Sequence, residues 1–239
     1  MNAHNFLIMA IPALVALGGG VLAAFWTPSH PTRGLIQHFA AGVVLAALAV
    51  ELLPEIEREH APSLVLVACF AAGSLFMYGL KIWTMGLEHQ AKLSGKTGGL
   101  SIGLLLATFI DVATDGFIIG AGFAAGGETG TILALGLSVE LLFLGLALTS
   151  SATAGWRIVA ISGALGTTVL VFAMLGSVLL SGASHAVIGG TLAFSAAALL
   201  YLVTEELLME AHEVEEKPIS TLILFGGFLA FWSIQLIGR

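Results

Sequence analysis

The sequence predicts an all-α membrane protein that crosses the bilayer eight times. Of its 239 residues, 58% are hydrophobic and only 10% are charged, with a mean hydropathy of +1.02. A soluble domain carries about 25% charged residues. The apolar runs are about twenty residues long, the length that a helix needs to cross a bilayer. A membrane barrel instead alternates polar and apolar residues over segments of about ten. We therefore expect helices within one transmembrane domain, residues 1–239.

Eight spans are read from the apolar runs in chain order. Their approximate bounds are 6–26, 34–53, 63–86, 100–124, 129–150, 157–180, 185–207 and 218–237. The first run is too long for a cleaved signal peptide and no basic segment precedes it, so we expect it to be retained as a span. The connections are too short to hold a soluble domain.

Charge predicts orientation and the class of partner. The connections after the first, third, fifth and seventh spans, with their edges, hold six of the eight Lys and Arg residues, which marks that side as cytoplasmic. We expect a multi-pass protein of the cell membrane, the cell inner membrane, with both termini extracytoplasmic. The formal charge of −7 argues against nucleic acid as a partner and is compatible with cations. Small-residue faces are compatible with a homodimer within the membrane lipid.

Two similar acidic stretches predict an inverted repeat. VELLPE (50–55) ends the second span and EELLMEA (205–211) ends the seventh, and these two spans run in opposite directions. We expect spans 1–3 to be related to spans 6–8, with spans 4–5 between them.

Three acidic residues lie inside the fourth and fifth spans. Asp111 and Asp115 are four positions apart, so a helix presents both on one face, one turn apart. Asp115 lies 12 positions before Gly127 and Glu140 lies 13 after it. At about 1.5 Å per residue, both lie about 18–20 Å from the turn between the two spans. We therefore expect the three carboxylates to meet near the middle of the bilayer.

An ionised side chain at that depth costs several kcal/mol unless it is compensated. Neither span contains Lys or Arg. Three interpretations remain open: a protonated, hydrogen-bonded cluster, a proton relay, or a metal site of hard oxygen ligands. The nearby hydroxyls of Thr108, Thr114 and Ser138 are expected to bond to their own helix backbones. Two aspartates on one helix do not suit a hydrolase, whose carboxyls come from different helices, so we do not expect an enzyme.

Acidic residues also flank the spans. Glu51 ends the second span, and Glu205 and Glu206 end the seventh. Glu55, Glu57 and Glu59 are expected to form a solvated face, as are Glu210 and His212 at the other side.

This layout resembles the ZIP (Zrt-/Irt-like) family of divalent metal transporters over nearly the whole chain. The stretch from Asp111 to Gly116, DVATDG, is similar to the family's span 4 motif HNxPEG and its variants that end in D-G. By that match Asp111 takes the histidine position and Asp115 the acidic one. Glu140 matches the first polar ligand position of span 5, and Glu51 matches a further ligand position in span 2.

The resemblance implies transport of a divalent metal into the cytoplasm by alternating access. The metal ligands it implies are Asp111, Asp115, Glu140 and Glu51, and the exit path passes Glu205, Glu206, Glu210 and His212. Leu144 stands at the second acidic position of span 5, which implies one metal site rather than two. The carboxylate ligands suit manganese or iron(II), and they accept zinc. The metal is the transported ion, and no tightly bound cofactor is expected. The alternative is a proton-coupled transporter of another substrate that uses the same carboxylates as a relay.

Overall fold

The computed structural model describes residues 3–26, 28–93, 102–147, 155–208 and 218–238. These ranges contain no strand, and eight of their helical segments are long and apolar enough to cross a membrane. The predicted helical membrane fold is confirmed at this level. The helices, in chain order, are α1 (Ala3–Phe25), α2 (His30–Ala47), η1 (Leu48–Leu52), α3 (Leu53–Arg58), α4 (Ser63–Leu93), α5 (Ile102–Ala125), α6 (Gly127–Ala147), α7 (Trp156–Leu179), α8 (His185–Leu202), η2 (Val203–Leu207) and α10 (Pro218–Gly238).

The second span is longer than the sequence predicts. Its apolar segment covers Pro31–Arg58, because α2, the π-helical turn η1 and α3 follow one another without a break. The expected end at residue 53 rested on the assumption that the acidic residues beyond it face water. Glu55 and Glu59 are instead buried, and the helix continues past Glu55 to Arg58, with Glu59 at its C-cap.

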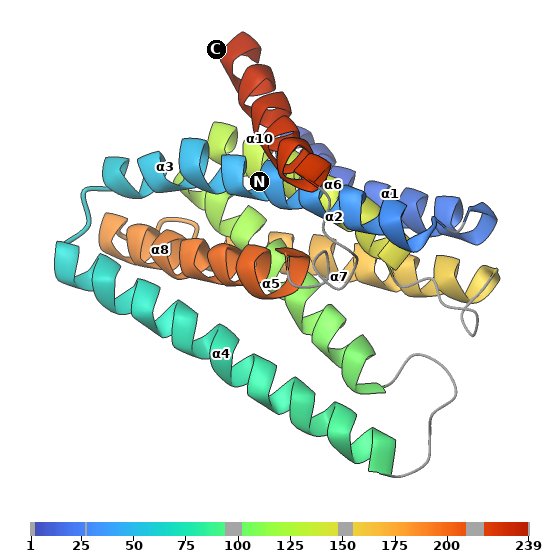
Figure 1. Cartoon of the computed structure of the whole chain (residues 1–239). Coiled ribbons are helices and arrows are strands. Elements are labelled where there is room, and N and C mark those ends of the chain that lie inside the picture. Colours follow the sequence, from blue (N-terminus) through green and yellow to red (C-terminus); the bar gives the residue numbers. More distant parts are fainter. Residues whose placement is uncertain (1–2, 27, 94–101, 148–154, 209–217, 239) are drawn as a thin grey trace.

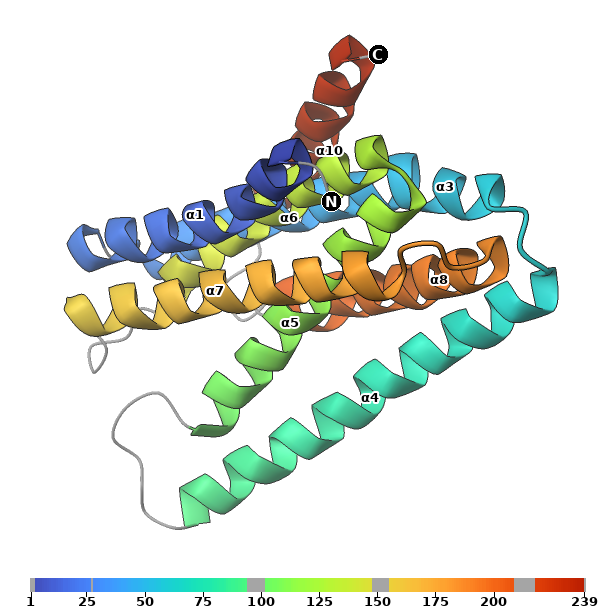
Figure 2. The same cartoon turned by 180° about the vertical axis from the view of Figure 1, so that it is seen from behind.

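The helices are arranged around the hairpin of α5 and α6, which meet at Gly126. We call this end of the bundle the turn end. α5 packs against α7, and α1 packs against both α6 and α7. Outside them, α2 pairs with α10 and α4 pairs with α8. Figures 1 and 2 show α4 and α10 at opposite edges of the bundle, inclined to the other helices.

Close backbone approach holds these helix pairs together. A Cβ added at Gly120 of α5 would collide with the carbonyl oxygen of Ala173 in α7. In the same way Gly42 of α2 abuts the carbonyl of Leu224, and Gly227 of α10 abuts that of Phe39. Small residues allow such contacts within a membrane, where the hydrophobic effect does not drive helices together.

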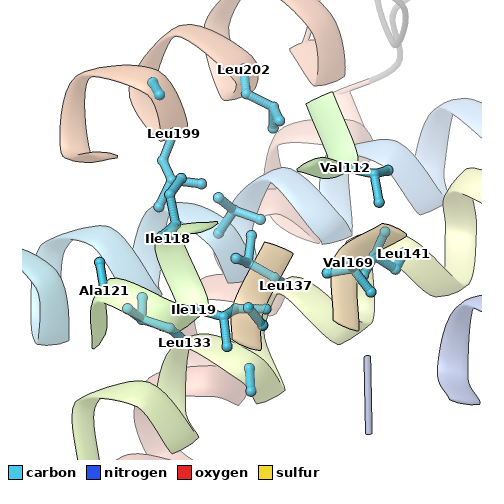
Figure 3. Close-up of a cluster of buried hydrophobic side chains, with 14 of the residues drawn as sticks. Val112, Ile118, Ile119, Ala121, Leu133, Leu137, Leu141, Val169, Leu199 and Leu202 are labelled. Atoms are coloured by element: carbon cyan, nitrogen blue, oxygen red, sulfur yellow. The ribbon is translucent and has the colours of Figure 1, made fainter. Parts of the chain in front are cut away.

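An apolar core fills the space between the central helices. Figure 3 shows side chains of α5, α6, α7 and α8 within one buried cluster. Ile118, Leu137 and Leu199 are each about 1% exposed. This packing fixes the rotation of α5 and α6 and therefore the direction in which their polar residues point.

We predict that Gly120→Ala destabilises the protein by about 1–3 kcal/mol, because the added methyl group meets backbone atoms that have no room to yield. Gly79→Ala is the matched control, since a Cβ at Gly79 has no neighbour within 4 Å. Thermal unfolding in detergent measures both variants. Equal melting temperatures for the two would contradict this account of the α5–α7 contact.

Candidate functional site

Three buried carboxylates meet between α5 and α6. Asp111, Asp115 and Glu140 each offer an oxygen atom, and these three atoms lie within 4.8 Å of one another. Their side chains are 8%, 2% and 6% exposed, respectively. We call this group the carboxylate triad. The structure thus brings together the three residues that the depth argument placed at one level.

The local structure explains the convergence. α5 contains no proline and remains helical through both aspartates, which places their side chains one turn apart on one face. Only Gly126 separates α5 from α6, so the chain returns at once and brings Glu140 back to the level of the aspartates. Gly116, next to Asp115, lets α7 approach closely, because a Cβ there would collide with the carbonyl of Val169.

Buried apolar residues flank the triad in the sequence. Val112 and Leu141, the sequence neighbours of Asp111 and Glu140, are at most 1% exposed (Figure 3). The hydroxyl of Thr114 donates to the carbonyl of Ile110 at 3.0 Å, and that of Ser138 donates to the carbonyl of Ala134 at 2.6 Å. Both hydroxyls therefore bond within their own helices, as the sequence predicts.

Glu51 lies outside the triad. Thr129 Oγ1 donates to Glu51 Oε1 at 2.9 Å, and Gln235 Nε2 donates to Glu51 Oε2 at 2.8 Å. Thr129 is in the first turn of α6, and Glu140 follows it by 11 positions, or about 16 Å along the helix. The buried carboxylate of Glu51 thus lies between the triad and the turn end.

Sequence reasoning missed the two residues that hold Glu51. Thr129 and Gln235 come from the first turn of α6 and the last turns of α10. The available signal was a lone amide, Gln235, within an apolar span. A buried amide in a membrane helix needs a polar partner, but the sequence does not indicate which one.

Glu55 and Glu59 continue the line of Glu51 at steps of four residues. We expected a solvated face here, and the structure corrects this: the two side chains are 8% and 6% exposed. Each has a basic partner, since Arg58 Nη1 lies 3.0 Å from Glu55 Oε2 and His185 Nδ1 lies 2.7 Å from Glu59 Oε2. The reason is packing, because α3 rests against α8 and buries this face. Only Glu57 is exposed as expected.

A second π-helical turn, η2, follows α8 directly. Glu205 and Glu206 lie in it, and the carbonyl of Glu205 accepts a hydrogen bond from Lys81 Nζ at 3.2 Å. The Glu205 side chain is half-buried. Glu210 and His212 lie outside the described residues. π-Helical turns are rare and frequently mark functional sites. Both π-helical turns in the described residues, η1 and η2, contain glutamate.

Comparison with known proteins does not assign this chain to a family. No protein-family model matches the sequence, and a search of curated proteins finds none similar to it.

We predict that Thr129→Val destabilises the protein by about 1–3 kcal/mol, because a buried oxygen of Glu51 loses its donor. Thr131→Val is the matched control on the same helix, since the Thr131 hydroxyl bonds to the carbonyl of Gly127 in its own helix. Thermal unfolding in detergent compares the pair, and an equal loss in both would show that the contact with Glu51 contributes nothing.

Proposed function

We propose that this protein is a divalent metal cation transporter of the ZIP type. The carboxylate triad is the observation that carries the proposal. Oxygen ligands that share one ion at about 2.0–2.6 Å lie up to about 4–5 Å apart, and the three oxygen atoms fall within 4.8 Å. Three ionised carboxylates this close repel one another strongly in an apolar interior. A divalent cation relieves that repulsion.

The chemistry of the ligands limits the metal. Carboxylate oxygens favour hard cations such as manganese and iron(II), and disfavour copper(I). Zinc is compatible, because it also accepts carboxylate ligands. The carboxylates must be deprotonated to bind, so protons compete with the metal for the site. The metal is the cargo and not a resident cofactor.

A path through the bundle follows from the buried acids. Glu59, Glu55 and Glu51 lead along one helix face from the turn end towards the level of the triad. Glu205 and Glu206 lie in the second π-helical turn, η2. We propose that metal enters at the turn end, binds the triad and leaves past η2 into the cytoplasm, where Glu210 and His212 extend the exit. Both termini are then extracytoplasmic, in the cell membrane.

The helix pairing supports an inverted repeat. If spans 1–3 correspond to spans 6–8 and span 4 to span 5, the pairing of α4 with α8 corresponds to that of α10 with α2. The packing of α5 on α7 likewise corresponds to that of α6 on α1. All four of these pairs are in contact.

The two π-helical turns support the same repeat. η1 contains Glu51, and η2 contains Glu205 and Glu206. A donor from the peripheral helix reaches the backbone of each: Gln235 Nε2 lies 3.4 Å from the carbonyl of Val50, and Lys81 Nζ lies 3.2 Å from that of Glu205. An inverted repeat provides two related conformations, which is the requirement for alternating access. We propose that α1, α5, α6 and α7 move against α2, α4, α8 and α10.

We predict that Asp115→Asn lowers uptake of manganese or zinc into proteoliposomes more than about tenfold, because the site loses a charged ligand. Glu57→Gln makes the same acid-to-amide change at an exposed position and should leave uptake unchanged. Uptake by Asp115→Asn at the rate of the unmutated protein would end the assignment. Proton movement in metal-free vesicles that requires the same acids would favour the proton-coupled alternative.

We also predict a hard-cation preference. Purified protein should retain manganese, iron(II) or zinc and should bind copper(I) more weakly, because the triad has neither imidazole nor thiolate. Equilibrium dialysis followed by elemental analysis measures this. A preference for copper(I) would exclude the triad as the binding site.

A further inference from the structure

A cavity of about 440 Å³ lies at the turn end, where the start of α1, the start of α6 and the last turns of α10 meet. The start of α1 lies beside α10 in both views (Figures 1 and 2). We call this the turn-end cavity. Three of its lining residues carry side chains that bind metals, namely His4, Glu128 and Gln235, and the described residues that line it include neither Lys nor Arg.

The amide of Gln235 is buried and only half satisfied. The residue is 7% exposed. Its Nε2 donates to Glu51 Oε2 at 2.8 Å and lies 3.4 Å from the carbonyl oxygen of Val50. Both partners are acceptors, so the nitrogen must face them and the orientation of the amide is fixed. Its Oε1 is also buried and has no hydrogen-bond partner among the described residues. A buried oxygen of this kind needs a donor or a cation.

The charges around the turn-end cavity favour a cation. Glu128 is exposed in the first turn of α6 and forms no ion pair within the described residues. Arg58 interacts with it electrostatically but is paired with Glu55 at 3.0 Å and does not line the cavity. The starts of α1 and α6 each carry a partial positive charge of about one half, and the end of α10 carries an equal negative one. The full charge of Glu128 makes the balance negative.

His4 completes a set of metal ligands. It lies in the first turn of α1 and is exposed. Together with Glu128 and Gln235 it offers an imidazole nitrogen, a carboxylate oxygen and an amide oxygen. Divalent first-row metals such as zinc accept nitrogen and oxygen ligands of this kind at about 2.0–2.2 Å, with water in a remaining position. Gln235 is held in place, and the two exposed side chains are free to turn towards it.

We propose that the turn-end cavity binds one divalent first-row cation, such as zinc, through His4, Glu128 and Gln235 Oε1. The cation satisfies the buried amide oxygen and joins α1, α6 and α10. It lies one amide group away from Glu51, because the nitrogen of the same side chain donates to Glu51 Oε2. This site is distinct from the carboxylate triad, and it does not depend on the transport proposed above.

Electron spin echo spectroscopy of the untagged full-length protein, loaded with Cu²⁺, tests the proposal. The method detects a coordinated imidazole, and the triad contains none. We expect an imidazole signal from one Cu²⁺ per chain, and His4→Ala should abolish it. His60→Ala is the matched control, because His60 is exposed but does not line the cavity. Asp115→Asn should keep the signal whether or not the unmutated protein transports metal, so the two proposals fail separately.

Zinc titration calorimetry in the Asp115→Asn background measures the two oxygen ligands. Glu128→Gln and Gln235→Leu should each weaken zinc binding about tenfold or more. Gln235→Leu also removes a donor from Glu51. Thr129→Val controls for that loss, because it removes the other donor of Glu51 while Thr129 lies outside the lining of the cavity. It should bind zinc as tightly as the background protein.

Three results would overturn the proposal. They are the absence of an imidazole signal, a signal that survives His4→Ala or is lost in His60→Ala, and zinc affinity that neither Glu128→Gln nor Gln235→Leu changes. The variants of His4 and Glu128 replace exposed side chains, so they test the site even if Gln235→Leu fails to fold.

Discussion

The gathering of three carboxylates inside an apolar bundle is the constraint on which the rest of this structure depends. An ionised group at membrane depth is costly, and three within 4.8 Å add mutual repulsion. The central hairpin of α5 and α6 nevertheless holds the three carboxylates together. α5 stays helical through Asp111 and Asp115, one glycine separates it from α6, and Gly116 brings α7 close. Under the function proposed above, a cation that occupies the triad during transport offsets this cost.

Glu51 shows how a buried carboxylate outside the triad is stabilised. Its two oxygens accept hydrogen bonds from neutral donors, Thr129 and Gln235, which come from different helices. Hydrogen bonds of this kind lower the cost of burial without introducing an opposite charge. Glu51 therefore ties α6 and α10 to the π-helical turn η1, and Lys81 makes a related contact at η2. The polar groups at the two π-helical turns thus connect them to α6, α10 and α4.

Much of the fold and of the carboxylate triad was predictable, because the pattern of apolar and charged residues along the sequence strongly constrains a membrane helix. Apolar run length predicts the eight spans, and equal distances from Gly127 place Asp115 and Glu140 at one level. The burial of Glu55 and Glu59 was not predictable, because it depends on α8, whose packing against α3 is a long-range contact. The partners of Glu51 were missed for the same reason, since Gln235 is 184 residues away.

Anomalous scattering from crystals grown with manganese or cadmium tests the central claim most directly. The account predicts one strong peak bonded to oxygen atoms of Asp111, Asp115 and Glu140, at about 2.0–2.6 Å from each. An empty triad in crystals that hold the metal at saturating concentration, or a peak confined to Glu55 and Glu59, would contradict it.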